Sequence, residues 1–159
     1  MLSRVEKFEV ALKQTECDAV LVTNLKNIYY LTGFSGTEAT VFISKKRRIF
    51  LTDSRYTLIA KGVVEGFDIV ETRDAVGEIA KIVADDKLEK IGFDDEISYA
   101  YFKMLESVFA GHELVPMTGF IENLRMIKDE QEIATIRRAC QISDQAFLDV
   151  LDFIKPGET

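Results

Sequence analysis

The segment Thr52-Asp53-Ser54-Arg55-Tyr56 combines an acid, a hydroxyl group, an arginine and a tyrosine within five residues. A β-prone run precedes it and a helical pattern follows it, and open α/β sheets commonly bind ligands at such strand ends. We expect Asp53 to cap the helix, which leaves the planar guanidinium of Arg55 free to receive a carboxylate or to pair across an interface. The alternative interpretation is a capped helix with an arginine on its surface.

A second segment, Thr32-Gly33-Phe34-Ser35-Gly36-Thr37, contains two glycines. Phosphate-binding loops place such glycines before a helix, but here a β-prone run follows, which favours a flexible turn. The sequence contains neither G-x-x-x-x-G-K-[ST] nor G-x-G-x-x-G between a strand and a helix. A module that binds a nucleotide or a small anion at residues 33–37 remains an alternative function.

Other titratable and metal-binding residues are few and poorly spaced for a site. The single histidine, His112, is expected in a surface turn. Asp85-Asp86 and Asp94-Asp95-Glu96 could bind a hard cation, but adjacent turn residues point apart, so we expect solvated loop charge. Cys17 and Cys140 form no C-x-x-C pair, which predicts reduced thiols. The sequence therefore predicts no catalytic residue and no metal site in this chain.

Composition narrows the class of protein. The 159 residues are 47% hydrophobic and 30% charged, which suits one globular domain with a sizeable core. The net charge of -7 disfavours nucleic acid binding, and we expect the basic run Lys45-Lys46-Arg47-Arg48 to form a solvated hairpin turn. No apolar run approaches the roughly 20 residues of a membrane span, and the mixed charges near Met1 argue against a secretory signal. A cytoplasmic location with no membrane partner is expected.

Predicted strands and helices alternate along the chain. Predicted strands cover residues 19–22, 39–43, 48–52, 68–71, 90–93 and 113–115, and predicted helices begin at Ser3 and cover residues 27–31, 54–64, 74–84 and 98–109. The four residues between the second and third strands suit an antiparallel hairpin. The pattern predicts an α/β fold with a mixed, roughly six-stranded sheet and flanking helices.

The last segment differs in character. Asp129 is a predicted N-cap with Glu132 at the N3 position, and an apolar stripe then runs from Ile133 to Ile154 until Pro156 stops the helix. A domain boundary is expected near residue 127, with residues 1–127 forming one domain and residues 128–159 starting another. Such a helix would be an unusual end for a complete domain, so we expect the protein to continue. Without a partner, the stripe should associate or fray.

Four stretches of the sequence resemble the creatinase/prolidase/aminopeptidase P family, in the order and spacing of that family. They are Asn27–Gly36, Thr52–Tyr56, Leu124–Ile133 and Ile154–Thr159. The resemblance spans essentially the whole chain. It implies that this chain is the N-terminal, non-catalytic domain of a two-domain enzyme, with a ribonuclease-H-like fold.

The resemblance also implies what the rest of the enzyme does. A C-terminal pita-bread domain would hold two divalent metal ions, Mn or Co, through two Asp, one His and two Glu ligands, and would hydrolyse the peptide bond before proline. None of those ligands can be placed on this sequence, so the chain alone should be inactive. The size of the domain favours an Xaa-Pro dipeptidase, with an Xaa-Pro aminopeptidase or a creatinase-type amidinohydrolase as alternatives.

In relatives this domain mediates dimerisation and leans over the active site of a neighbouring subunit. The expected partners are therefore its own catalytic domain, a second copy of the chain and a proline-containing dipeptide. The residues expected to wall the access route are Phe34, Ser35, Thr37, Asp53, Arg55 and Tyr56. Tyr29 and Tyr30 are expected to serve core and interface packing.

Overall fold

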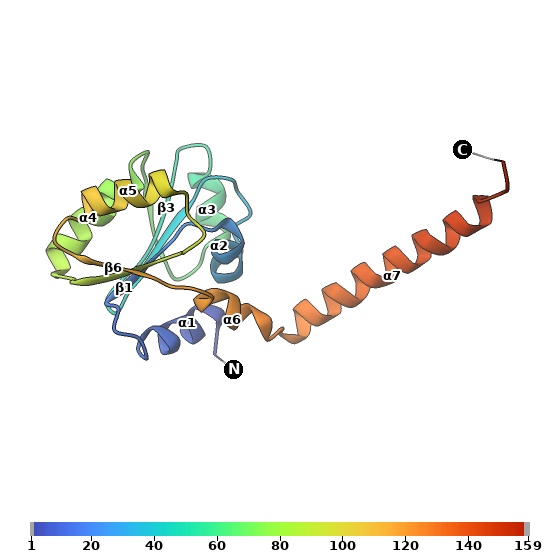
Figure 1. Ribbon diagram of the computed structural model, residues 1–159, viewed down its shortest axis with the longest axis horizontal. Helices are drawn as coiled ribbons and strands as arrows, with labels where there is room; N and C mark the ends of the chain where they lie inside the picture. Colours follow the sequence, from blue (N-terminus) through green and yellow to red (C-terminus); the bar gives the residue numbers. More distant parts are fainter. Residues whose placement is uncertain (1, 158–159) are drawn as a thin grey trace. The chain divides into compact units, whose positions relative to one another are not determined.

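The computed structural model describes residues 2–157, which form two units that meet between Leu124 and Arg125. The first unit is built on one mixed sheet in the order β4-β3-β2-β1-β5-β6 (Figure 1). β2 runs antiparallel to β1 and β3, and the other neighbours are parallel, so the predicted hairpin and the predicted mixed sheet of six strands are confirmed. The strands are β1 (Ala19–Val22), β2 (Thr40–Ser44), β3 (Arg48–Thr52), β4 (Asp68–Glu71), β5 (Lys90–Phe93) and β6 (Glu113–Pro116).

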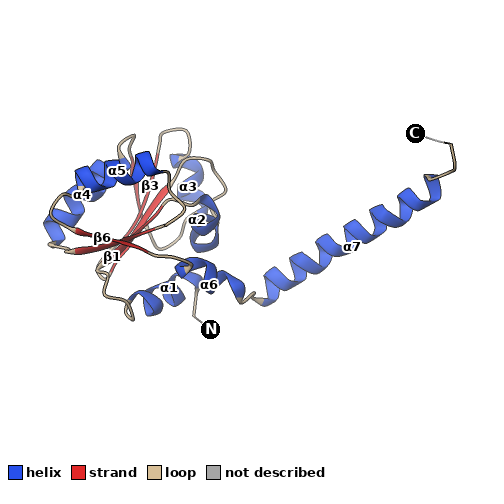
Figure 2. Cartoon of the chain, in the orientation of Figure 1, coloured by secondary structure: helices blue, strands red, loops and turns tan. Residues whose placement is uncertain are grey.

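Helices cover both faces of this sheet (Figure 2). The helices of the first unit are α1 (Arg4–Leu12), α2 (Leu25–Thr32), α3 (Thr57–Val63), α4 (Ala75–Asp86), α5 (Tyr99–Val108) and α6 (Phe120–Met126), the last of which reaches the unit boundary. Helix α6 was not predicted, because its short apolar run after Gly119 has no capping signal and reads as a loop. Helix α2 ends at Thr32 and is capped by Gly33, where φ is 75°, a conformation that only glycine adopts freely.

Alternation along β1 divides the core in two. Val20 and Val22 pack with the apolar sides of α1 and α2, whereas Ala19 and Leu21 pack with those of α4 and α5. All four residues of β1 are buried, which confirms the predicted central strand. A strand buried on both faces can carry no charge of its own, so charged residues lie just beyond its two ends.

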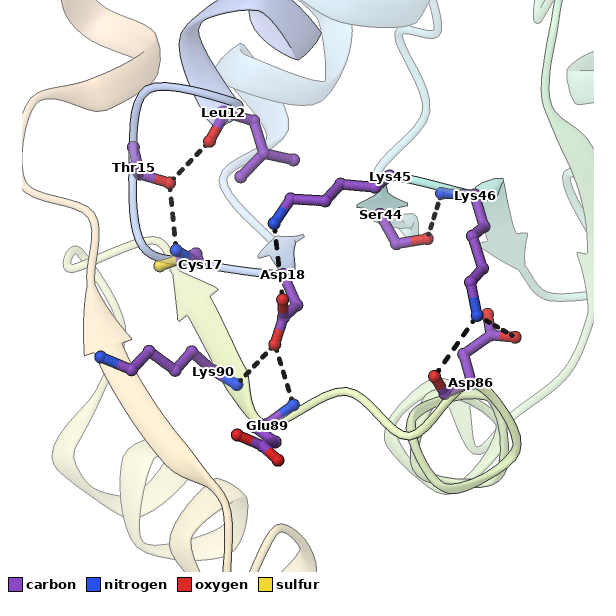
Figure 3. A network of polar contacts seen from close by, with 10 residues as sticks. All are labelled: Leu12, Thr15, Cys17, Asp18, Ser44, Lys45, Lys46, Asp86, Glu89 and Lys90. Carbon is purple, nitrogen blue, oxygen red and sulfur yellow. Dashed lines mark hydrogen bonds and ion pairs between the residues drawn. The ribbon is translucent and has the colours of Figure 1, made fainter.

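At the amino end of β1, Asp18 ties this strand to β5 (Figure 3). One carboxylate oxygen accepts the backbone N–H groups of Glu89 at 2.9 Å and Lys90 at 3.1 Å, and the other lies 3.5 Å from Nζ of Lys45. Burial alone would raise the pKa of Asp18, but these donors together lower it, so the carboxylate form is favoured.

The basic run lies in the β2–β3 hairpin turn, and acids from other elements neutralise it. Lys46 lies 3.8 Å from the Asp86 carboxylate (Figure 3). Arg47 binds the same carboxylate through two contacts, at 2.8 and 3.0 Å. Arg48 binds Glu9 of α1 in the same two-pronged manner, at 2.6 and 2.8 Å. The prediction of solvated loop charge at Asp86 was wrong, because this residue ends α4 and its carboxylate is held by the hairpin.

At the carboxyl end of the same strand pair, Asp94 makes the corresponding connection, because it follows β5 and accepts N–H groups that follow β1. Its Oδ2 accepts the N–H groups of Thr23 at 2.6 Å and Asn24 at 2.8 Å, and its Oδ1 accepts Nδ2 of Asn27 at 3.2 Å. Asp94 is only 8% exposed, so the prediction of solvated loop charge was wrong here too. The backbone donors where β1 passes into α2 offset part of the free-energy cost of burying this carboxylate.

The second unit contains α7 (Glu130–Phe153). Asp129 and Glu132 form the predicted capping box, with Asp129 Oδ1 accepting the Glu132 N–H at 2.8 Å. None of the helix residues is buried within the part of the chain that the structure describes, and the stripe that includes Phe147 and Ile154 is exposed. The apolar side of α7 therefore has the residue pattern of a helix that packs against another surface.

Replacing Asp94 by alanine should destabilise the first unit by about 1–3 kcal/mol, because the partly buried N–H groups of Thr23 and Asn24 would lose their acceptor and the buried Asn27 amide would lose one of its two acceptors. Urea denaturation of the 159-residue chain measures this change. Asp95→Ala is the matched control, since Asp95 is the exposed neighbour, and it should change the free energy of unfolding by less than about 0.5 kcal/mol. Equal effects of the two substitutions would contradict the role given to Asp94.

The same residue should make stability depend on pH. Burial raises the pKa of Asp94 above its ordinary value, against the opposing effect of its N–H donors. The folded protein then holds this proton more tightly than the unfolded chain, so the stabilisation is complete below the ordinary pKa and is lost as the pH rises through the raised one. The free energy of unfolding of the wild type relative to Asp94→Asn should therefore fall across that window. A constant or rising difference in a pH series would contradict this assignment.

Candidate functional site

The carboxyl ends of β1, β3, β4 and β5 meet at one edge of the sheet, together with the amino end of β2. Two pockets open along this edge, with volumes of about 300 and 530 Å³. Thr52, Asp53 and Arg55 line the smaller pocket, and Thr37 lines the larger one. The edge is where open α/β sheets bind ligands, which agrees with the position expected for the Thr52–Tyr56 segment.

An aromatic contact joins the two predicted segments. The rings of Phe34 and Tyr56 lie edge to face with their centroids 5.7 Å apart, and the hydroxyl groups of Thr37 and Tyr56 are 2.8 Å apart, within hydrogen-bond distance. Phe34 is only 1% exposed and also contacts Phe50 of β3, so it holds Tyr56 in place from beneath. Ser35 is exposed on the same loop.

Arg55 is not free, contrary to the expectation that Asp53 caps the following helix. Helix α3 begins at Thr57, and Asp53 lies one turn too early to cap it with its side chain. The Asp53 carboxylate instead accepts the Arg55 backbone N–H at 2.9 Å and binds its guanidinium at 2.9 and 2.6 Å. This pairing lowers the pKa of Asp53. The Arg55 side chain remains 66% exposed, and its carbon Cζ lies 5.5 Å from the centre of the Tyr56 ring.

The structure therefore brings Thr37, Asp53, Arg55 and Tyr56 into one connected surface, with Phe34 as its support. Sequence reasoning missed two residues of the same edge, Glu38 and Arg73, which line both pockets. Nothing in the local pattern singles out Glu38. A signal was available for Arg73, since it lies between the predicted strand 68–71 and the predicted helix 74–84, at a strand end where such sheets bind ligands.

None of these groups forms a metal site. Within residues 2–157 no cluster of three or more His, Cys, Asp or Glu side chains could hold a metal ion. His112 lies near the Phe109 carbonyl, with Nδ1 at 3.3 Å, and its ring lies edge to face with the Phe109 ring. No helix in the described range is both long and apolar enough to span a membrane.

Residues 4–127 match the family described as the Creatinase/Prolidase N-terminal domain. The chain belongs to this family. The match covers the whole first unit described above except its first few residues, including both segments that form the candidate site. The resemblance seen in the sequence is thereby confirmed, and the sheet and flanking helices are those of this domain.

Relatives with known names are peptidases. The uncharacterized peptidase YqhT of Bacillus subtilis is 35% identical over 156 residues, which is 97% of this chain and 44% of that protein. The structure of an Xaa-Pro dipeptidase from Bacillus anthracis superposes with a TM-score of 0.90 at 35% identity, over 98% of this chain and 44% of that one. The structure of aminopeptidase P from Streptococcus thermophilus matches 77% of this chain and 95% of that one at 57% identity, with a TM-score of 0.75.

The chain spans less than half the length of the curated relatives it matches. In those relatives the remaining part of the protein has no counterpart in this chain. The candidate site must therefore be understood as one surface of an N-terminal domain in a peptidase family.

The loop that carries Phe34, Ser35 and Thr37 leaves no room for a side chain at Gly36. A Cβ atom there would lie 2.6 Å from Phe34 Cε1 and 3.0 Å from Tyr56 Cδ1. Gly36→Ala should destabilise the chain by about 1–3 kcal/mol, because the buried Phe34 ring would have to move. In the control Gly62→Ala, nothing lies within 4 Å of the new Cβ in helix α3, so a gain of about 0.5–1 kcal/mol is expected. Denaturant midpoints of the two variants measure the contrast, and a neutral Gly36→Ala would contradict the packing described.

Proposed function

We propose that this chain is the non-catalytic N-terminal domain of a metal-dependent Xaa-Pro dipeptidase, and that its Arg55 surface narrows access to an active site in another domain. The observation that carries the proposal is the match to the family of N-terminal domains. The carboxyl edge of the sheet presents the exposed side chain of Arg55, and the described residues contain no cluster that could hold a metal ion. Metal-activated water would supply the nucleophile in the part of the protein beyond this chain.

Arg55 is suited to meeting a carboxylate. Asp53 binds Nε and Nη2 and thereby fixes the plane of the guanidinium, and the Tyr56 ring lies against it. Holding the side chain in one position removes much of the entropy cost of binding. Nη1 makes no hydrogen bond within residues 2–157, so its N–H groups can donate to the free carboxylate of a dipeptide. A longer peptide has no carboxylate at that place.

Two further surfaces support association with protein partners. Helix α3 exposes Leu58 at 83%, with Ile59 and Val63 also exposed, and we assign this side to contact with a second copy of the protein. The apolar stripe of α7 we assign to the protein's own catalytic domain, because its pattern is that of a buried helix.

An Xaa-Pro aminopeptidase is the second candidate. It is favoured by the 57% identity to the Streptococcus thermophilus protein, whereas the dipeptidase is favoured by the match to the Bacillus anthracis protein, which extends through α7. Both candidates assign catalysis to a domain beyond this chain.

The test compares this chain with the longer protein that contains it, using Ala-Pro and Ala-Pro-Ala with added Mn²⁺. We expect hydrolysis only by the longer protein, with Ala-Pro as the preferred substrate. Preference for the tripeptide would select the aminopeptidase, and hydrolysis by the 159-residue chain or by neither protein would contradict the proposal.

The same assay tests Arg55. In the longer protein, Arg55→Ala should raise KM for Ala-Pro by about tenfold or more with little change in kcat, since a charged hydrogen bond to bound substrate would be lost. Lys13→Ala, an exposed change at the end of α1, is the control and should leave both constants unchanged. An unchanged KM in Arg55→Ala would remove Arg55 from the access route.

A further inference from the structure

The two pockets at the carboxyl edge share a wall that the proposed function does not use. Glu38, Thr40, Arg73 and Ala75 line both pockets. This shared wall lies where β3 and β4 end, and all of its residues belong to the first unit. The pockets therefore adjoin, with two opposite charges where they meet.

Arg73 is a cation on a fixed backbone. The Thr72 N–H donates to the Thr52 carbonyl at 2.8 Å and so extends the β3–β4 pairing by one residue, and the Asp74 N–H donates to the Thr72 hydroxyl at 2.9 Å. Asp74 then caps α4 by accepting the Gly77 N–H at 2.9 Å. Within residues 2–157 the Arg73 guanidinium itself makes no hydrogen bond or ion pair.

Glu38 is the complementary anion. Its backbone carbonyl accepts the Thr52 hydroxyl at 2.6 Å, which anchors the segment before β2 to the end of β3. Its carboxylate makes no hydrogen bond or ion pair within the described chain. Asp53 and Arg55 on the same pocket bind each other, and Arg55 is already assigned to the access route. Arg73 and Glu38 are therefore the two charged side chains of this pocket that have no partner among the described residues.

The larger pocket adds an apolar lining. Its walls include Leu25, Val76, Ile97, Tyr101 and Met104, contributed by α2, α4, α5 and the segment before α5. An apolar side chain of a ligand could lose its contact with water there, which is favourable in proportion to the area covered.

We infer that this edge binds a short peptide with both ends free and with an apolar side chain. The ligand carboxylate pairs with Arg73, its ammonium group pairs with Glu38, and its side chain enters the larger pocket. A phosphate or nucleotide suits the edge less well, because Glu38, Asp74 and Glu96 line it and would repel a dianion. The inference does not depend on the peptidase assignment, since the pockets are complete within the first unit.

The probe is the dipeptide Leu-Gly, titrated into the ¹⁵N-labelled 159-residue chain and followed by NMR. We expect saturable shifts of the amides of Arg73, Ala75 and neighbouring pocket residues. N-acetyl-Leu-Gly, Leu-Gly amide and Gly-Gly should each bind at least about tenfold more weakly, because each lacks one of the three interactions.

Substitutions of Arg73 and Glu38 test whether Leu-Gly binds at these two pockets. Arg73→Gln should weaken Leu-Gly binding by about tenfold or more and should abolish the discrimination against Leu-Gly amide, and Glu38→Gln should do the same for N-acetyl-Leu-Gly. Arg137→Gln, an exposed change on α7, is the matched control and should bind normally. Absence of saturable shifts at millimolar Leu-Gly, or binding that survives Arg73→Gln unchanged, would overturn the inference. Either failure would leave the peptidase proposal standing, because no hydrolysis is measured.

Discussion

Two carboxylates that each accept a pair of backbone N–H groups hold β1 and β5 together from both ends. Asp18 precedes β1 and binds the start of β5, and Asp94 follows β5 and binds the end of β1. Parallel strands cannot be joined by a tight turn, so their ends need another connection. The carboxyl edge keeps its shape because Asp94 fixes the point where β1 passes into α2.

That fixed edge supports two different uses of arginine. Arg55 is held by Asp53 and lies against Tyr56, a geometry suited to reaching outward toward another domain. Arg73 stands on an equally fixed backbone but keeps its guanidinium unpaired among the described residues, a geometry suited to a ligand that enters the pocket. One edge of the sheet can therefore serve both the access role that we propose and a separate peptide site.

The sequence predicted the features that depend on residues close together along the chain. The buried strand Ala19–Val22, the hairpin and the capping box at Asp129 follow from neighbouring residues, and all are present. Contacts between distant residues could not be predicted in the same way. Asp94 binds N–H groups 70 and 71 positions earlier, and Asp86 binds Arg47 across 39 positions, so both looked like solvated charge. In the candidate site the Asp53–Arg55 pair was missed for a local reason, since α3 starts later than its apolar pattern indicates.

Hydrogen exchange at the Thr23 and Asn24 amides measures how firmly Asp94 holds the carboxyl edge, because these N–H groups lie beyond the end of β1 and have Asp94 as their acceptor. If the carboxylate holds this edge, both amides should be protected nearly as well as those within β1, and Asp94→Ala should remove that protection selectively. Rapid exchange of both amides in the wild-type chain would show that the edge is not held by Asp94 and would contradict the account.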